Sequence, residues 1–277
     1  MNKRFSFLSL LFGLFVCVTA FSACGGDDEP SSGGNSGSGS SETPQSSKHV
    51  VKITTEEGNA FYESSFSYDS QGRVTKIIET ESGAGTNSHS EKTYQYGEML
   101  IVTKSVMEVT YSNGQSSSLS ESHSYTLENG RIVKDEEIQA SNGNSSSTIT
   151  ETFSYDANNN LSSISRKGSN YDSETKNITW SDGNLIKLGN GAFTYSNYPW
   201  AKGFPFYLKG SNTDANLFAM GYYGNIPQNL PSKYTYSETS GYTYEYSFDG
   251  SYVTKVVITP FVETNKSQKS ISTIVWE

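Results

Sequence analysis

Residues 66–77 read FSYDSQGRVTKI, and this short stretch decides which fold the sequence predicts. Two aromatic residues spaced by one position precede a polar turn, and aliphatic residues follow the turn at Val74 and Ile77. Asp69 is suited to cap a type I turn with its carboxylate, and Gly72 to supply the positive φ that closes a short hairpin. The stretch therefore predicts two antiparallel strands joined by a tight turn.

The hairpin unit is repeated along the chain. Residues 153–164, FSYDANNNLSSI, align with it without a gap, and Asn159, the next best residue at positive φ, takes the place of Gly72. Looser copies occupy residues 94–96, 125–134, 178–188 and 244–256. From Tyr68 to Trp180 the aromatic positions recur every 25 to 30 residues, a period typical of stacked units of two strands and two turns each.

Long polar loops alternate with the tight turns. They cover residues 82–90, 112–118, 141–147 and 167–173. Tight turns then fall at one edge of the sheet and loose loops at the other, as in an up-and-down meander. The 19 tyrosines of the chain suit the same class, because tyrosine favours pleated, half-buried surfaces. We expect an all-β antiparallel meander of repeated hairpins, bent into a strongly curved sheet or half-barrel.

The aliphatic residues that follow each tight turn are three positions apart, as in Val74 and Ile77 or Leu161 and Ile164. A flat strand with one buried face would place them two apart. Two explanations are open: the strand has a β-bulge after the turn, or both of its faces are partly covered. Repeated bulges would also bend the sheet.

Residues 192–234 interrupt the repeat with four prolines and eleven aromatic residues. Proline suits loops and not central strands. Within this insert, residues 214–220 form a predicted short helix, with Asn212 or Thr213 as N-cap and Gly221 just past its end. We interpret the insert as a lid packed on the sheet.

The first 24 residues predict where the protein works. A basic start precedes an apolar run from Phe5 to Phe21, which is short for a membrane span, and Ser22-Ala23-Cys24 follows. This predicts a cleaved lipoprotein signal peptide over residues 1–23, with Cys24 carrying the lipid, although Phe21 departs from the usual leucine. The alternative is an ordinary signal peptide with a chance cysteine. Residues 24–47 form the lipidated cysteine and a flexible Ser/Gly linker, and residues 48–277 the all-β repeat domain.

Three resemblances add to this prediction. Residues 25–29, GGDDE, resemble the acidic export tag of Bacteroidetes surface lipoproteins, and the alternative is a solvated start to the linker. Residues 68–73 look like the YD repeat of Rhs-type shells. The whole domain is similar to a family of uncharacterised Bacteroidetes lipoproteins with a porin-like fold, through Cys24 and its acidic tail and through residues 153–164, 180–187 and 221–231. The export tag implies a lipid-anchored protein at the outer membrane that faces the cell exterior, and the family resemblance implies a curved antiparallel sheet. The family resemblance implies no catalytic or ligand residues.

Composition excludes several classes of function. The two cysteines are Cys17, within the signal, and Cys24, so the domain has no disulfide, thiol nucleophile or cysteine-ligated zinc. The formal charge is −9, and removal of Lys3 and Arg4 with the signal makes it −11. Such an acidic chain lacks the electrostatic footprint of a nucleic-acid-binding protein, and the lipid must do the anchoring.

No residue pattern predicts catalysis, a metal or a cofactor. Residues 156–167 begin like a calcium loop, but Leu161 and Lys167 occupy positions that require Gly and Glu. The three histidines, His49, His89 and His123, read as scattered surface residues. Residues 135–137 read as a solvated strand end. Sequence alone does not identify a carboxylate pair at glycosidase distance. We therefore predict that the protein is not an enzyme.

Aromatic residues of the insert are the candidate binding residues, and two hypotheses use them differently. The first is a non-enzymatic surface lipoprotein that binds an envelope protein or scaffolds a complex; the alternative is a glycan-binding accessory lipoprotein of a polysaccharide-uptake system. The aromatic side chains would be buried in the first and exposed for stacking in the second. A transmembrane barrel is disfavoured, because Glu, Lys and Ser occupy both parities of the strands. The candidates are Tyr198, Trp200, Phe206, Tyr207, Tyr222 and Tyr223.

Overall fold

The computed structural model describes residues 48–83, 85–142, 144–169, 171–201, 203–206, 213–261 and 268–277. The predicted signal peptide, Cys24 and the linker lie outside the described residues, as do Tyr207 and Asn212. In the described part of the chain, no helix is long and apolar enough to cross a membrane.

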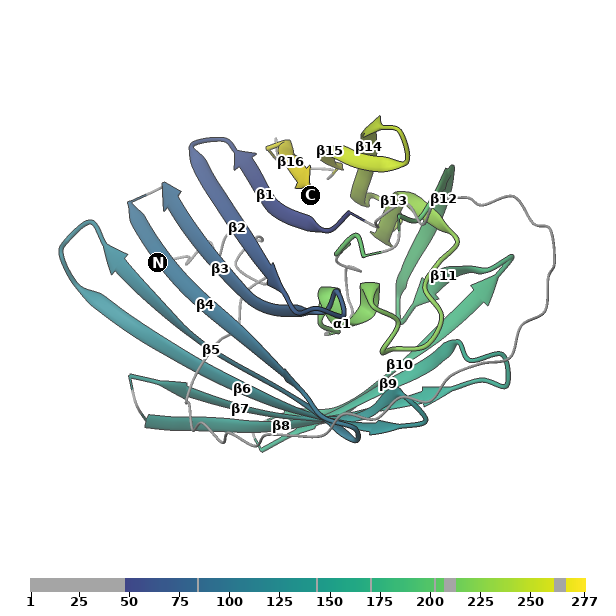
Figure 1. The fold of residues 1–277 in the computed structure, drawn as a ribbon, viewed down its shortest axis with the longest axis horizontal. Coiled ribbons are helices and arrows are strands. Elements are labelled where there is room, and N and C mark those ends of the chain that lie inside the picture. Colours follow the sequence, from purple (N-terminus) through teal and green to yellow (C-terminus); the bar gives the residue numbers. More distant parts are fainter. Residues whose placement is uncertain are drawn as a thin grey trace, which may run out of the picture.

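The described residues form a closed antiparallel barrel with one short helix (Figure 1). Every strand pairs with its neighbours in sequence, and β1 pairs with β16 to close the ring. The predicted all-β meander is therefore confirmed, and its curvature is complete. The elements are β1 (Val50–Glu57), β2 (Ala60–Tyr68), β3 (Val74–Gly83), β4 (Thr86–Tyr96), β5 (Leu100–Tyr111), β6 (Ser116–Glu128), β7 (Arg131–Ser141), β8 (Asn144–Tyr155), β9 (Leu161–Gly168), β10 (Tyr171–Ser181), β11 (Asn184–Leu188), β12 (Gly191–Pro199), α1 (Ala215–Ala219), β13 (Asn229–Ser237), β14 (Ser240–Asp249), β15 (Tyr252–Phe261) and β16 (Ser270–Trp276).

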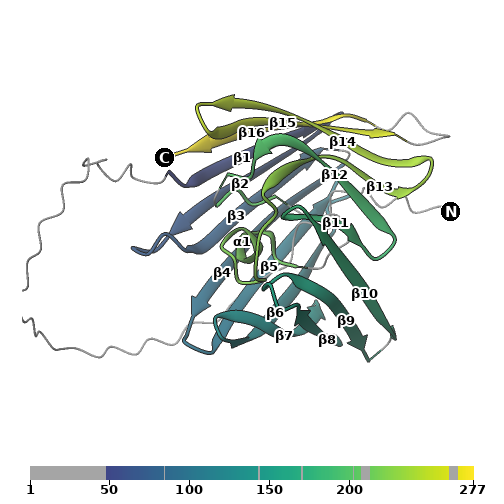
Figure 2. The same ribbon diagram turned by 90° about the vertical axis from the view of Figure 1, so that its right-hand side faces the viewer.

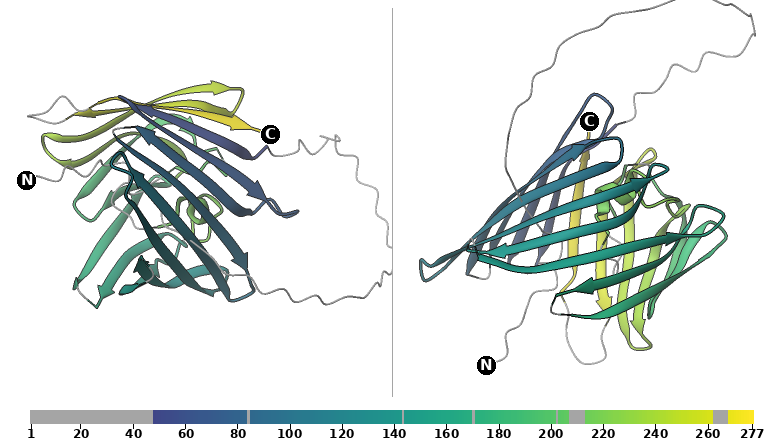
Figure 3. Two further views of the ribbon diagram at one scale, coloured as in Figure 1. Left: turned by 90° about the vertical axis from the view of Figure 1, so that its left-hand side faces the viewer. Right: turned by 90° about the horizontal axis from the view of Figure 1, so that it is seen from below.

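Closure satisfies the backbone groups that an open meander would leave at its edges. Along β1 and β16 the pairing runs from Val50 opposite Trp276 to Glu57 opposite Ser270. The backbones of His49 and Glu277 exchange hydrogen bonds of 2.6 and 2.9 Å just beyond the strands. Figures 2 and 3 show the resulting ring from other directions, with the long strands β5 to β8 forming one continuous stretch of wall.

The predicted tight turns are confirmed. Gly72, Gly130 and Asn159 have φ values of +73°, +75° and +67°. Asp69 caps its turn as expected, since its Oδ1 accepts from the backbone N–H of Gln71 at 2.9 Å and of Arg73 at 3.0 Å. Connections after even-numbered strands lie at one end of the barrel, which we call the tight-turn rim, and those after odd-numbered strands lie at the other. The long loops predicted at that second end are wrong, because the strands run through most of their residues: 86–90 belong to β4, 116–118 to β6 and 144–147 to β8.

A β-bulge follows the tight turn, and it explains the aliphatic spacing of three. In the first hairpin Ser67 pairs with Lys76 but Tyr68 pairs with Val74, so Thr75 is the extra residue. The bulge turns both Val74 and Ile77 inward, where each is 4% exposed. Equivalent shifts occur between β6 and β7, β8 and β9, β10 and β11, and β14 and β15. Of the two explanations left open by the sequence, the bulge is the one the structure contains.

Each bulge is also where one repeat is joined to the next. The Tyr96 hydroxyl donates to the Val74 carbonyl at 2.8 Å, and the Tyr155 hydroxyl donates to the carbonyl of Ile132. The indole N–H of Trp180 does the same to Leu161 at 2.9 Å. The aromatic residues recur in each repeat because their polar ends donate hydrogen bonds to the backbone carbonyl groups at the bulges.

The insert lies inside the barrel, not on the sheet as a lid. Figures 1 and 2 show α1 within the ring of strands. The insert's backbone is bonded to the tight-turn rim: Tyr222 accepts from Ile132 at 2.7 Å, and Asn225 donates to Asn159 at 3.0 Å. We call the described residues 200–201, 203–206 and 213–228 the plug.

The helix of the plug is confirmed but its predicted N-cap is wrong. Asp214 is the N-cap, with its side chain accepting from the backbone N–H groups of Asn216 and Leu217. The reason is tertiary: the same carboxylate also meets a lysine of the barrel wall, which fixes it at the helix start. Gly221 follows the helix with φ +85°, as expected.

Candidate functional site in the barrel lumen

Barrel and plug together line a cavity of about 520 Å³ that is partly open to solvent. The plug contributes Phe204, Phe206 and Asp214 to its lining. One side of the cavity is mostly apolar, with the hydroxyls of Thr55, Ser270 and Ser272 among its residues. The other side carries charged and amide groups from β3, β4, β6, β7 and β9. The apolar side includes Ile53, Val256, Ile258 and Ile274, and the polar wall consists of Glu79, Lys92, Glu121, His123, Glu137, Gln139 and Arg166.

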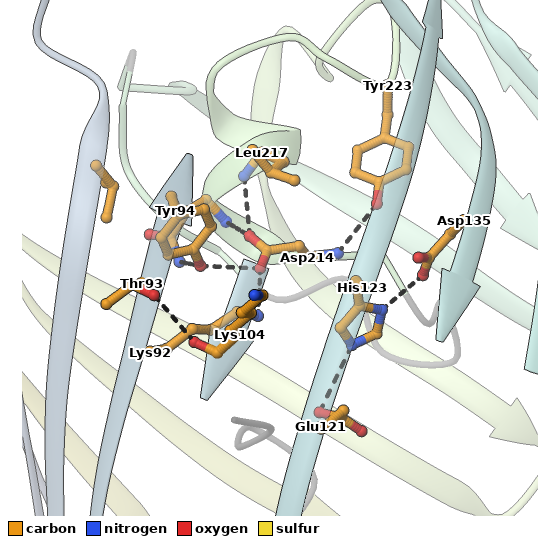
Figure 4. A network of polar contacts seen from close by, with 12 residues as sticks. Lys92, Thr93, Tyr94, Lys104, Glu121, His123, Asp135, Asp214, Leu217 and Tyr223 are labelled. Atoms are coloured by element: carbon orange, nitrogen blue, oxygen red, sulfur yellow. Dashed lines mark hydrogen bonds and ion pairs between the residues drawn. The ribbon is translucent and has the colours of Figure 1, made fainter. Parts of the chain in front are cut away.

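The first polar cluster joins the plug to the barrel. Lys92 of β4 forms an ion pair with Asp214, with Nζ and Oδ2 2.6 Å apart, and the Tyr94 hydroxyl donates to the same oxygen at 2.9 Å (Figure 4). Burial alone would raise the pKa of the Asp214 carboxyl, but Lys92 and the hydrogen bonds at the helix start hold it below its usual range. The cluster thus keeps a charge pair inside the barrel.

The second cluster surrounds His123. Its Nδ1 lies 2.8 Å from Asp135 Oδ2, and its Nε2 lies 3.5 Å from Glu121 Oε2 (Figure 4). Gln139 donates from Nε2 to Glu121 Oε1 at 2.8 Å and also to Glu137 Oε1. The cluster therefore brings one imidazole and three carboxylates together within two strands.

Strand register explains why these groups meet. His123 of β6 stands opposite Glu137 of β7, and Glu121 stands opposite Gln139. Side chains two residues apart on a strand share a face, so the four form a two-by-two patch that faces the lumen. One feature of the sequence could have indicated this patch. Glu121 and His123 have the same strand parity as the repeat aromatic Tyr125, which faces inward.

Two sequence predictions are wrong here. His123 is not a surface residue, since its side chain is 12% exposed. Residues 135–137 are not a solvated strand end, because Asp135 and Glu137 are 3% and 7% exposed, and only Glu136 between them faces out. Closure of the sheet is the cause, since it converts one polar face of each strand into the lining of a lumen.

Electrostatics in the lumen leave it short of positive charge. Burial would lower the pKa of His123, but its hydrogen bonds to Asp135 and Glu121 outweigh this and raise it to about 10, so the ring is protonated. Burial raises the pKa of Glu79 to about 8, with Lys92 opposing the shift. Burial likewise raises the pKa of Glu137, while the nearby His123 opposes it. Burial therefore makes both carboxyls hold their protons more tightly than they would in water.

The six predicted binding aromatics do not form one exposed surface. Tyr198 is 50% exposed and packs on Phe248, with ring centroids 4.7 Å apart. Trp200 is 8% exposed and packs on Phe206 at 5.6 Å. Tyr222 is half-buried, Tyr223 is buried in the plug, and Tyr207 lies outside the described residues. Of these residues Phe206 contributes to the cavity.

The outer wall of the barrel carries charged pairs. Lys52 and Glu63 lie 2.8 Å apart on β1 and β2, with side chains 42% and 32% exposed. Lys76 of β3 pairs with Glu91 of β4. These residues alternate along their strands with residues that line the cavity, so they face outward.

A closed antiparallel barrel with an internal plug and a charged lumen defines the class of this protein. The chain belongs to the family described as a domain of unknown function (DUF4595) with porin-like fold, whose profile matches residues 66–257. A solved structure titled as a porin-like protein from Bacteroides vulgatus is similar to it, with 9% sequence identity and a TM-score of 0.46. That similarity covers 83% of this chain and 99% of the other. No curated protein matches the chain.

Proposed function

We propose that this protein is a non-enzymatic, lipid-anchored binding protein of the bacterial cell envelope that holds a small amphipathic molecule in its lumen. The observation that carries the proposal is the plugged cavity of about 520 Å³, mostly apolar on one side and polar on the other. Cavities of roughly 300–1,000 Å³ suit small ligands. The apolar part of the ligand lies against β1, β15 and β16, and its polar head faces the charged wall.

The charged groups of the lumen support binding in preference to proton transfer. Lys92 is held by Asp214, and His123 by Asp135 and Glu121. Groups fixed in this way are preorganised to hydrogen-bond a polar head without moving. The charged outer wall supports a barrel whose exterior meets water, which leaves anchoring to the lipid on Cys24.

A cavity-filling variant tests the proposal. Thr55 of β1 lines the cavity, and Thr54 beside it faces outward. N-phenyl-naphthylamine, a fluorescent amphipathic amine, should bind the native protein saturably with one probe per chain. Thr55→Trp should abolish the fluorescence gain, and Thr54→Trp should preserve it. Equal binding by both variants, or absence of saturable binding, would reject the lumen as the binding site.

The lipid anchor is tested at Cys24. The apolar run and Ser22-Ala23 before Cys24 support lipidation. Cys24→Ala should leave the protein soluble or unprocessed and should abolish labelling with radioactive palmitate. Palmitate labelling that persists in the variant would contradict the anchor. Protease shaving of intact cells should release the barrel if it faces the exterior.

A glycan is the second candidate ligand. Aromatic rings stack on sugar faces, and the cavity lining includes Tyr62, Tyr94, Phe206 and Tyr244 beside carboxylates and amides. This version of the hypothesis places the sugar in the lumen instead of on Trp200, whose side chain is buried. Calorimetric titration with a panel of neutral oligosaccharides tests it, with Thr55→Trp as the blocked control.

A further inference from the structure

We propose that Glu121, His123 and Glu137 form a divalent-metal site in the polar wall of the lumen, with zinc as the best-suited ion. One oxygen from each carboxylate and one ring nitrogen of His123 lie within 4.8 Å of one another. All three residues also line the cavity. The inference depends on the lumen geometry and not on the proposed function.

The strands supply these ligands from a rigid base. His123 and Glu137 are directly opposed in the β6–β7 register, and Glu121 is two residues before His123 on the same face. Zinc binds imidazole nitrogen and carboxylate oxygen at about 2.0–2.2 Å. The two glutamate side chains are flexible, so they reach such distances by rotation while the strands stay in place.

Asp135 orients the ring of His123. Its Oδ2 lies 2.8 Å from His123 Nδ1, and this contact leaves Nε2 directed at Glu121. A carboxylate on the far nitrogen of a metal-binding histidine fixes the tautomer and ring orientation and increases the basicity of the other nitrogen. The Asp135–His123 pair has this arrangement before any metal is bound.

The two carboxylates are held toward one another by a shared hydrogen-bond donor. Glu121 and Glu137 share the Nε2 donor of Gln139. A dication placed between them would satisfy both. The His123 ring gives up its Nε2 proton to solvent when that nitrogen binds the metal. The other nearby cation is Arg166, whose Nη2 lies 3.6 Å from Glu137 Oε2, but its Nε also lies 3.6 Å from Glu151. Arg166 therefore keeps an ion-pair partner when Glu137 turns to the metal.

The mixture of donors selects the kind of ion. Calcium prefers six to eight oxygen ligands and magnesium an octahedral shell rich in water. One imidazole with two carboxylates matches zinc and related transition metals. Three protein ligands leave a coordination position open, and it faces the cavity, where water or the polar head of a bound molecule completes the shell.

Paired variants test the site on the full chain, solubilised in detergent, stripped with chelator and carrying Cys17→Ser and Cys24→Ser so that no thiol contributes. Calorimetric titration with zinc chloride should give one ion per chain. Glu137→Gln and His123→Gln should weaken zinc binding about tenfold or more. Their matched controls are Glu136→Gln, on the outer face, and His89→Gln, on the exposed part of β4, which should bind zinc as before.

Cobalt provides a readout that does not depend on the variants folding. Cobalt(II) added to the metal-free protein should give visible absorption bands of a four- or five-coordinate site, and zinc should displace them. Bands of a six-coordinate aqueous ion only, a stoichiometry well below one, or equal zinc affinity in Glu137→Gln and Glu136→Gln would overturn the inference. Zinc binding without probe binding would leave this site standing and reject the proposed function, and the reverse result would do the opposite.

Discussion

Lys92 of the barrel wall and Asp214 of the plug form an ion pair with 2.6 Å between Nζ and Oδ2. Their side chains are 16% and 3% exposed, so the pair is enclosed. Asp214 also caps α1 and accepts from the Tyr94 hydroxyl. One carboxylate thus links the plug helix to the wall, which makes the plug part of the folded barrel.

Removal of this carboxylate should destabilise the whole domain. Asp214→Ala leaves Lys92 buried without its partner, so the free energy of unfolding should fall by about 3–5 kcal/mol. Urea unfolding measures the change. The control is Glu63→Ala in the exposed pair with Lys52, which should cost less than about 1 kcal/mol. Equal effects at the two sites would show that the plug is not coupled to the wall.

The bond between Tyr96 and the bulge carbonyl of Val74 should contribute measurably to stability. Tyr96→Phe removes only the hydroxyl, so a loss of about 0.5–1.5 kcal/mol is expected in urea unfolding. Tyr236→Phe, at a ring that is 43% exposed, serves as the control and should have little effect. A neutral result at Tyr96 would mean that water replaces the bond without cost.

The stability cost of a substitution in a tight turn should depend on how easily the new residue adopts a positive φ. A Cβ at Gly130 would meet nothing within 4 Å, so Gly130→Val measures backbone strain, with an expected loss of roughly 1–2 kcal/mol. Gly130→Asn should cost less, as Asn159 shows at the equivalent conformation. Gly72→Val should cost more than Gly130→Val, because a Cβ there would lie 2.7 Å from His49 Cε1. Thermal unfolding ranks the three, and a reversed order would refute this account.

Trp200 should behave as a core residue of the plug. It is 8% exposed and packs on Phe206 and Phe218, so Trp200→Ala should cost about 3–5 kcal/mol. Tyr198→Ala, at a residue that is 50% exposed, should cost much less. Melting curves of the two variants separate the roles. Unchanged stability of the Trp200→Ala protein would instead indicate that Trp200 is a surface residue that can bind a ligand.

Glu79 should make stability depend on pH. Burial raises its pKa in the folded protein to about 8, above the ordinary value of 4.5. Ionisation is thus less favourable in the fold, and stability should fall as pH rises from about 5 to about 9, by on the order of 2 kcal/mol after solvent screening. Glu79→Gln should flatten this slope in urea unfolding.

The neighbouring hydroxyl of Ser64 allows a second test of the Glu79 pKa, in which the pKa is raised further. Ser64 donates to Glu79 Oε1 at 3.2 Å and opposes the rise in pKa. Ser64→Ala should therefore raise the Glu79 pKa further, which extends the loss of stability to higher pH and makes the total loss larger. An identical slope in all three proteins would show that Glu79 is solvated in solution.

Local chemistry was sufficient to predict the hairpins. Positive φ at Gly72 and Asn159 and the cap by Asp69 depend on residues within one turn, so sequence reveals them. The spacing of Val74 and Ile77 also indicated a bulge, although it could not distinguish a bulge from two covered faces. The N-cap of α1 was missed, because Asp214 is selected by Lys92, which is 122 residues away in sequence.

The candidate site could not be predicted in the same way. Glu121, His123 and Glu137 carry the alternating polar pattern of any half-exposed strand, and nothing in that pattern says which polar face is enclosed. The side of the sheet on which the insert packs was equally undetermined, since aromatic residues bury against either face.

The sequence by itself determined the repeat, the turns, the strand parity and the all-β class, because these follow from φ preferences and side-chain alternation over a few residues. The tertiary structure decided that β1 meets β16, that the insert enters the ring, and that the polar face of β6 and β7 lines a cavity. Closure depends on small bends added over the entire meander, and only their sum brings the ends together. Once the ring is closed, the same glutamates and histidine that would be solvated on an open sheet become a buried, charged site.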